Sequence, residues 1–127
     1  MQQILIDACG WVAIIDSKMN MDAELSRIYG PCSFLLLQSV EQELISLNNQ
    51  RPRNKNLLLG LLMKKSEPIE ALSQDFSHPD DQLFTLASKH GYPVLTVDID
   101  LKRRLYEQGL PVLEVNKSQR LHLLEKV

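Results

Sequence analysis

The sequence predicts an α/β protein, a three-layer α/β/α sandwich built on a mainly parallel central sheet of about five strands. Short apolar segments alternate with amphipathic helical segments, the order that produces parallel strands joined by helical crossovers. The first apolar segment is continuous rather than alternating, as in strands that are buried on both faces. A chain of 127 residues is long enough for one core but not for two, so we expect a single domain over residues 1–127.

The first half of the chain opens with the strand Gln3–Ile6, which ends at Asp7 and leads into the apolar helix Ala8–Ile15. Asp22 is a candidate N-cap for a second helix, which Gly30 ends. The elements expected next are the strand Ser33–Leu37, the helix Val40–Asn48 with Ser39 as its candidate N-cap, the polar and basic loop Asn48–Asn54, and the apolar helix Lys55–Lys64.

The second half of the chain continues the alternation. Ile69–Leu72 is a weak third strand, followed by the polar loop Gln74–His78. Pro79 suits the first position of a helix that continues over Asp80–His90 and stops at Gly91. The remaining expected elements are the strand Pro93–Val97, the helix Asp98–Gln108, the strand Pro111–Val115 and a last helical turn or two within Ser118–Lys126.

The composition is that of an ordinary soluble globular domain, with 44% apolar and 24% charged residues. The net charge of −2 argues against a chain that binds nucleic acid through overall positive charge. Cys9 and Cys32 fit no metal-binding spacing, so we expect buried free thiols and a reducing compartment. The first strand begins too early for a signal peptide and no apolar run is of membrane-spanning length, so we expect a cytoplasmic protein.

Acidic residues directly follow two of the predicted strands. Asp7 ends the first strand and Asp98 ends the fourth. In open α/β sheets, ligands bind beyond the carboxyl ends of the strands, so these two carboxylates are candidate site residues. For each residue alone, the alternative is a helix N-cap, a common role for aspartate.

Further acids lie on two of the predicted helices, and one acid from each helix is a candidate for the same site. Asp80 shares a stripe with the apolar residues of its helix, which places its carboxylate at the start of the buried face. Asp81, the next residue, lies on a different face of the helix, where its negative charge would interact favourably with the positive end of the helix dipole. In the helix Val40–Asn48, Glu43 and Glu41 border opposite edges of the apolar stripe, and periodicity does not choose between them.

Carboxylates gathered near one buried point raise each other's pKa unless a cation lies between them. Oxygen ligands without His or Cys select Mg²⁺ or Mn²⁺, and such ions activate water for in-line displacement at a phosphodiester. Nearby cations would contact the nucleic-acid backbone; the candidates are Lys102, Arg103 and Arg104, with a second cluster at Arg51 and Arg53. The alternative for such basic runs is a solvated surface.

Over nearly its whole length, the chain resembles the PIN-domain ribonucleases. The stretches that carry the resemblance are ILID, VEQELISL, HPDDQLFTLASKHG, VLTVDIDLKRRL and the closing GLPVLEV. The run from DDQL through LKRRL resembles the branch related to archaeal rRNA-processing nucleases more than typical VapC toxins. The resemblance implies an endoribonuclease that depends on Mg²⁺ or Mn²⁺, and it selects Glu43 over Glu41.

The resemblance also implies roles for individual residues. Catalytic and metal-binding roles fall on Asp7, Glu43, Asp80 and Asp98, with Asp100 and Asp81 as further candidate metal ligands and Thr96 in a supporting role. The chain departs from the family directly after the first acid, where Ala8 and Cys9 replace the usual Ser or Thr and Asn. Because those polar residues orient the acid, we expect the departure to affect the rate of catalysis.

The expected function is hydrolysis of phosphodiester bonds in single-stranded or ribosomal RNA. One alternative is a VapC-type toxin that pairs with an antitoxin, and another is a PIN domain that binds RNA or protein without cutting, which Ala8 and Cys9 favour. A receiver domain is disfavoured because it needs adjacent acids after the first strand. A haloacid-dehalogenase-like phosphatase needs an acid where Cys9 stands. The apolar side of the Leu57–Met63 segment is a candidate homodimer surface.

Overall fold

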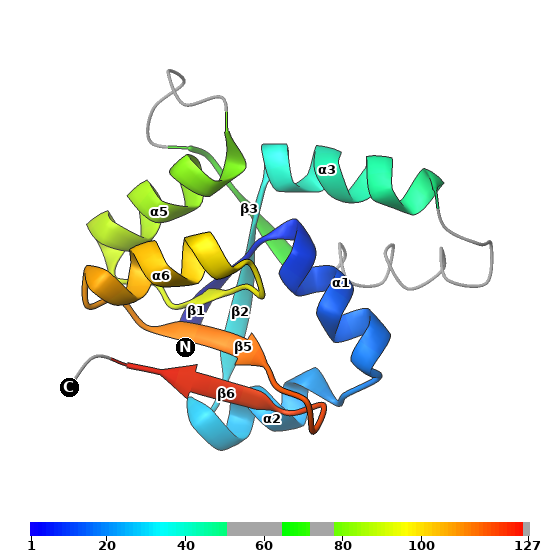
Figure 1. The fold of residues 1–127 in the computed structure, drawn as a ribbon, viewed down its shortest axis with the longest axis vertical. Coiled ribbons are helices and arrows are strands. Elements are labelled where there is room, and N and C mark those ends of the chain that lie inside the picture. Colours follow the sequence, from blue (N-terminus) through cyan, green and yellow to red (C-terminus); the bar gives the residue numbers. More distant parts are fainter. Residues whose placement is uncertain (51–64, 72–77, 126–127) are drawn as a thin grey trace.

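A six-stranded sheet forms the centre of the fold, with helices on both of its faces (Figure 1). The computed structural model describes residues 1–50, 65–71 and 78–125. The strands are β1 (Gln2–Ile6), β2 (Cys32–Leu37), β3 (Ser66–Ile69), β4 (Val94–Leu95), β5 (Val112–Val115) and β6 (Leu121–Leu124), and the described helices are α1 (Ala8–Ser17), α2 (Met21–Ile28), α3 (Gln38–Asn49), α5 (Pro79–His90) and α6 (Ile99–Glu107). The predicted α/β fold with a mainly parallel sheet is confirmed, with six strands in place of about five.

The strand order is β3-β2-β1-β4-β5-β6, and all neighbours are parallel except β5 and β6. The chain winds outward from β1 to β3 and then returns to β4, which pairs with β1 through Ile6 and Leu95. Right-handed crossovers therefore place α1, α2 and α3 on one face of the sheet and α5 and α6 on the other. Ligand sites of open sheets lie where the direction of winding reverses, here between β1 and β4. Asp7 follows the end of β1, and Asp98 lies shortly after the end of β4.

The core lies on both faces of the two central strands. Leu5 and Leu95 are fully buried, and Trp11 of α1 packs edge-on against Phe34 with ring centroids 6.0 Å apart. On the opposite face, Leu83 of α5 is also fully buried. Burying one such side chain contributes about 1.5–3 kcal/mol, so the apolar strands hold the polar ends of the sheet in fixed positions.

The end of the described chain corrects one prediction, because the helical turn expected within Ser118–Lys126 is replaced by β6. The Asn116 side chain accepts a hydrogen bond of 3.0 Å from the backbone N–H of Arg120, which stabilises a tight turn. Leu121 is buried and His122 is exposed, the alternation of a strand. Pairing with β5 satisfies backbone groups that one helical turn would leave unpaired.

Smaller corrections concern element boundaries. β3 begins three residues before the predicted strand Ile69–Leu72. It pairs with β2 from Phe34 opposite Ser66 to Leu37 opposite Ile69, and both strands end there. Asn20 rather than Asp22 caps α2, and its side chain accepts a hydrogen bond of 3.1 Å from a backbone N–H. Ser39 lies inside α3 and donates its hydroxyl hydrogen to the Gln82 side chain. The outcomes for β3 and Ser39 depend on tertiary neighbours, whereas Asn20 caps α2 through a local hydrogen bond.

Several predictions fall outside the described residues. They are the helix Lys55–Lys64, most of the loops Asn48–Asn54 and Gln74–His78, and the candidate homodimer surface. Cys9 and Cys32 are free thiols, as predicted, but half-buried rather than buried. None of the helices in residues 1–50, 65–71 and 78–125 combines the length and the apolar character needed to cross a membrane.

Candidate active site

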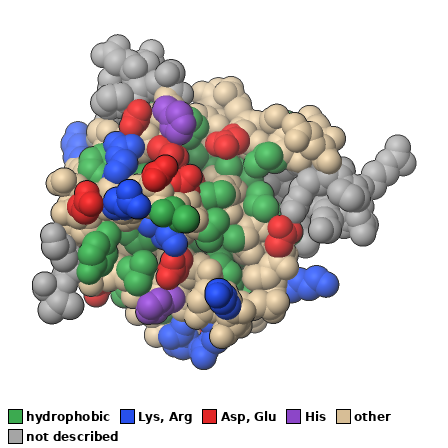
Figure 2. Space-filling view, in the orientation of Figure 1, with side chains coloured by type: hydrophobic (Ala, Val, Ile, Leu, Met, Phe, Trp, Pro, Cys, Tyr) green, Lys and Arg blue, Asp and Glu red, His purple; other side chains and the backbone are tan. Residues whose placement is uncertain are grey.

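A pocket of about 430 Å³ opens beyond the carboxyl ends of the central strands β1 and β4. Its lining consists of Asp7, Ala8, Cys9, Glu43, His78, Pro79, Asp80 and Asp98. Four separate segments thus bring one carboxylate each to the same space: the end of β1, α3, the start of α5 and the N-cap of α6. Acidic side chains gather on the face shown in Figure 2, with Lys and Arg side chains beside them.

Asp7 is the most buried of these acids, with 5% of its surface exposed. Its Oδ1 caps α1 by accepting a hydrogen bond of 2.7 Å from the Gly10 N–H, and its Oδ2 accepts from the Thr96 hydroxyl at 2.5 Å. Burial raises the pKa of Asp7, its hydrogen bonds oppose that rise, and the negative charge of Asp80 adds to it. The carboxylate is therefore both a helix cap and a wall of the pocket, so the two roles are not alternatives.

Gly10 lets α1 approach the sheet closely enough for this arrangement. A Cβ at this position would lie 2.5 Å from the carbonyl oxygen of Leu95 and 2.8 Å from Oδ1 of Asp7. Both distances are shorter than real Cβ contacts, and the first involves backbone that cannot easily move. The absence of a side chain is thus what seats the helix N-terminus against Asp7.

Asp98 occupies the same kind of position on the neighbouring strand. Its Oδ1 caps α6 by accepting a hydrogen bond of 2.9 Å from the Leu101 N–H. Its own backbone N–H donates to the Thr96 hydroxyl at 3.1 Å. Thr96 is fully buried, so one hydroxyl group contacts both strand-end acids.

Asp80 and Asp81 are consecutive but face different partners. Asp80 lines the pocket, and burial together with the negative charge of Asp98 raises its pKa, although His78 and Arg104 act in the opposite direction. Asp81 forms an ion pair of 3.0 Å with Arg104 and is absent from the pocket lining. Of these two acids, only Asp80, the one on the apolar stripe of the helix, lines the pocket.

The two glutamates of α3 are also separated by the structure. Glu43 lines the pocket and is exposed to solvent, whereas Glu41 is not part of the lining. Asp100 is exposed in the first turn of α6 and likewise lies outside the lining. Of the candidate metal ligands, the pocket therefore brings together Asp7, Glu43, Asp80 and Asp98 but not Asp81 or Asp100.

Cys9 and His78 also line the pocket, and the hydrogen bond from the Cys9 thiol is a contribution that sequence reasoning missed. The Cys9 thiol donates a hydrogen bond of 3.1 Å to Oδ2 of Asp7. Burial and then the charge of Asp7 raise the pKa of Cys9 to about 11, so the thiol stays protonated and remains a donor. His78 caps α5, where its Nδ1 accepts from the Asp80 N–H at 3.1 Å. The sequence leads us to expect a surface or capping role for His78, and it caps α5.

The predicted phosphate-binding cations differ in their surroundings. Lys102 forms an ion pair of 2.7 Å with Glu114, and Arg104 is paired with Asp81. Arg103 is exposed and makes no ion pair with any residue in the described ranges. Arg51 and Arg53 lie outside the described residues.

The chemistry of the pocket suits a hard divalent cation. Its acids offer oxygen donors, and burial and mutual repulsion raise the pKa of two of them, which a bound cation would relieve. Within the described residues, no three Asp, Glu, His or Cys side chains lie close enough to ligate one ion together. Mg²⁺ commonly binds through one or two carboxylates and keeps several waters, and this donor set fits that mode.

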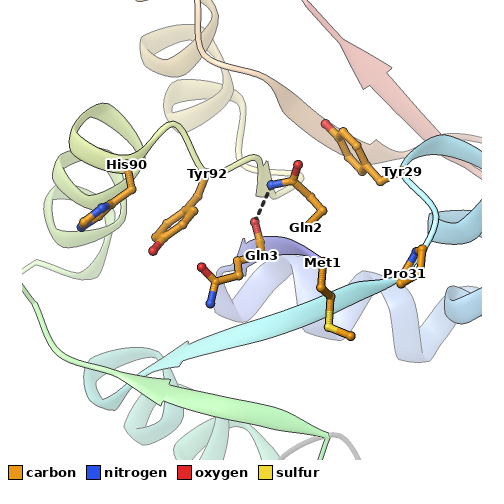
Figure 3. Close-up of a pocket in the computed structure, with 7 residues that line it drawn as sticks. All are labelled: Met1, Gln2, Gln3, Tyr29, Pro31, His90 and Tyr92. Atoms are coloured by element: carbon orange, nitrogen blue, oxygen red, sulfur yellow. Dashed lines mark hydrogen bonds between the residues drawn. The ribbon is translucent and has the colours of Figure 1, made fainter.

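A second, larger hollow of about 710 Å³ lies at the opposite edge of the sheet, where β1, β2 and β4 begin (Figure 3). It is lined by Met1, Gln2, Gln3, Tyr29, Pro31, His90 and Tyr92. The rings of His90 and Tyr92 stack with centroids 4.9 Å apart, and the Gln2 amide donates to the Gln3 carbonyl. No carboxylate lines this hollow, so the smaller pocket is the candidate for metal-dependent chemistry.

Comparisons with known proteins agree with this fold. The family described as PIN like domain matches residues 4–118. The chain is 26% identical to Ribonuclease VapC9 of Archaeoglobus fulgidus, with 86% of each chain covered. The structure of the PIN domain endonuclease Utp24 is similar with a TM-score of 0.80 and 20% identity, covering 98% of this chain and 92% of that one. The crystal structure of PAE2754 from Pyrobaculum aerophilum has a TM-score of 0.62 and 13% identity, covering 81% and 79%.

Proposed function

Because the chain belongs to the PIN-like domain family, we propose that it is a metal-dependent endoribonuclease whose active site is the acidic pocket. Family membership and the similarity to a curated ribonuclease support ribonuclease activity in general. The observation that carries the proposal is the pocket lining, in which Asp7, Glu43, Asp80 and Asp98 come from four segments of the chain. A fold needs no such gathering of like charges for stability alone.

In the proposed mechanism, Asp7 and Asp98 are the rigid metal-binding side chains. Each carboxylate accepts a cap hydrogen bond from a backbone N–H, and Thr96 donates in addition to the Asp7 carboxylate and accepts from the backbone N–H of Asp98. Neither carboxylate therefore has to be reoriented when an ion binds. A bound Mg²⁺ or Mn²⁺ would supply an activated water and neutralise charge that develops at the phosphate. Glu43 is exposed to solvent and completes the acidic lining of the pocket.

Asp80 is the proposed proton acceptor for the attacking water. Its carboxylate lines the pocket, and a general base has to lie within hydrogen-bond reach of the water from which it takes the proton. Asp7 also lines the pocket, but three hydrogen-bond donors already occupy its oxygens. Of the two, Asp80 therefore has the freer lone pairs.

The proposal is tested by cleavage of a labelled single-stranded RNA in Mn²⁺, Mg²⁺ or EDTA. We expect wild-type cleavage in a divalent metal and a loss of about a hundredfold or more in Asp98→Asn, which keeps a capping side chain. Glu43→Gln and Glu41→Gln form a matched pair on α3, and only the first should lose activity, because only Glu43 lines the pocket. Equal cleavage by wild type and Asp98→Asn would exclude this pocket.

Binding without cutting is the main alternative, and the replacement of the usual polar pair by Ala8 and Cys9 was its main support. Cys9 nevertheless donates a hydrogen bond to Asp7, so one polar contact to the first acid is retained. RNA that is bound but uncut in every metal would favour the binding module and contradict the proposed activity.

The biological setting is a finer proposal. A role in ribosomal RNA processing rests on the DDQL to LKRRL resemblance, whereas the similarity to VapC9 favours a toxin with an antitoxin partner. A toxin should arrest growth when it is expressed alone and release the arrest when the product of a neighbouring gene is co-expressed. A processing enzyme should instead leave ribosomal precursors uncut when Asp98→Asn replaces it.

A further inference from the structure

Three exposed side chains form a stripe along α6. Ile99 is 68% exposed, Tyr106 is 43% exposed, and Arg103 is exposed between them. Spacings of four and three residues place them on one helical face, because the helix repeats every 3.6 residues. Leu101 and Leu105 are buried on the opposite face and hold the helix against the sheet.

This stripe is unusual in its apolar content and in its position. The described residues have five exposed large hydrophobic side chains, and Ile99 and Tyr106 are two of them. Ile99 directly follows Asp98, so the stripe begins at the rim of the acidic pocket and continues along α6. Exposed apolar side chains grouped beside a site indicate a contact surface.

The cation at the centre of the stripe differs from its two neighbours. The Lys102 ammonium group is engaged by Glu114 at 2.7 Å. The Arg104 guanidinium is engaged by Asp81 and lies 4.6 Å from the centroid of the Phe84 ring. Arg103 makes no such contact within the described part of the chain, which leaves its guanidinium available for a phosphate.

We propose that Ile99, Arg103 and Tyr106 form a track that binds single-stranded RNA on one side of the scissile phosphate. The proposal rests on the proposed function and specifies which part of the surface holds the substrate. The seven steps from Ile99 to Tyr106 rise about 10 Å along the helix axis at about 1.5 Å per residue.

The chemistry of the stripe favours unpaired RNA over other occupants. An exposed tyrosine ring stacks on any base that is not already stacked in a duplex, and the Ile99 side chain offers a second apolar contact beside the pocket. A cation between them complements the phosphate that links the two bases. A protein surface docked on this face would have to place a carboxylate against Arg103, whereas RNA carries a phosphate at every nucleotide.

The test measures binding of a labelled oligouridylate and of an RNA duplex of equal length in Mg²⁺. All variants are made in the Asp98→Asn background, so that cleavage does not interfere. We expect Arg103→Gln to weaken single-strand binding about five- to tenfold. It should also reduce the slope of log binding constant against log salt concentration by about one phosphate contact, whereas Arg103→Lys should keep most of that slope. The control Lys89→Gln removes an exposed charge at the far end of α5 and should change neither the affinity for single-stranded RNA nor its salt dependence.

The two apolar positions are tested separately from the charge. We expect Tyr106→Leu, which keeps apolar area but removes the ring, to weaken oligouridylate binding about fivefold or more, and Tyr106→Phe to retain it. Ile99→Ser should weaken single-strand binding and leave the weaker duplex binding unchanged.

Unchanged oligouridylate binding in Arg103→Gln and Tyr106→Leu would overturn the proposal, as would a parent protein that binds neither RNA. RNA binding unchanged by Ile99→Ser and Tyr106→Leu, with an altered sedimentation coefficient, would identify a protein contact instead. Cleavage by the protein with native Asp98 is scored separately. If the protein cleaves RNA but the stripe variants have no effect on binding, only the proposed RNA track is wrong. If the stripe variants weaken binding but the protein does not cleave RNA, only the proposed nuclease activity is wrong.

Discussion

The hydroxyl of Thr96 donates a hydrogen bond of 2.5 Å to Oδ2 of Asp7, although 89 residues separate the two in the sequence. The same hydroxyl accepts from the backbone N–H of Asp98 at 3.1 Å. One fully buried oxygen thus connects the ends of β1 and β4, the two strands between which the winding of the sheet reverses. The relative position of the two strand-end acids depends on this contact.

Replacing this hydroxyl tests its importance directly. Thr96→Val keeps the shape but leaves Asp7 without its donor, which should lower the free energy of unfolding by about 1–3 kcal/mol. Misplacement of the acid should also slow RNA cleavage by roughly ten- to a hundredfold. Urea unfolding and single-turnover cleavage measure the two effects. Thr96→Ser retains the donor, and equal losses in Ser and Val would contradict this role.

The Cys9 thiol should behave as a hydrogen-bond donor and not as a nucleophile. Cys9→Ala removes the donor to Asp7 and should lower the free energy of unfolding by about 0.5–1.5 kcal/mol and slow cleavage, whereas Cys9→Ser should retain both. Because the pKa of Cys9 is raised to about 11, alkylation at pH 8 should be slow compared with a free thiol. Mass spectrometry of alkylated protein checks this, and rapid alkylation of Cys9 would contradict it.

Gly10 should tolerate no side chain. In Gly10→Ala, the new Cβ would meet the Leu95 carbonyl oxygen at 2.5 Å, so the N-terminus of α1 must shift away from the sheet. We expect a loss of roughly 1–3 kcal/mol in the free energy of unfolding despite the better helix propensity of alanine. Ser26→Ala on the exposed side of α2 is the control. Stabilisation of Gly10→Ala would show that the close approach is absent in solution.

The raised pKa of Asp80 predicts how stability depends on pH in the metal-free protein. Burial favours the protonated carboxyl, so the folded state binds more protons than the unfolded state between the ordinary value of 3.8 and the higher folded pKa. This contribution to stability is therefore largest at low pH and is lost as the pH rises through the folded pKa. In EDTA at neutral pH, Asp80→Asn should be more stable than wild type.

The difference between wild type and Asp80→Asn isolates this residue from other titrating groups. It should shrink as the pH falls through the folded pKa, since the protonated acid resembles the amide. Saturating Mg²⁺ should reverse the order at neutral pH, because an ion that binds the charged pocket stabilises only the folded state. Thermal unfolding in EDTA and in Mg²⁺ measures both, and a difference independent of pH would contradict the assignment.

Local patterns were sufficient for most of the elements and for the inward orientation of Asp80, because helical and strand periodicities are properties of neighbouring residues. They failed at β6, where the alternation of Leu121 and His122 is too short to distinguish a strand from a turn. Periodicity also left Glu41 and Glu43 undecided, because both border the same stripe. The family resemblance selected Glu43, and Glu43 lines the pocket.

The sequence by itself determined the α/β alternation and which acids end strands, because both follow from local order along the chain. Only the tertiary structure decided which of those strands lie side by side, and hence that Asp7, Thr96 and Asp98 meet. It likewise decided that Lys102 and Arg104 are engaged in ion pairs, whereas Arg103 forms none with the residues that the structure describes. Contacts between residues distant in sequence depend on strand pairing and helix packing, which no local periodicity encodes.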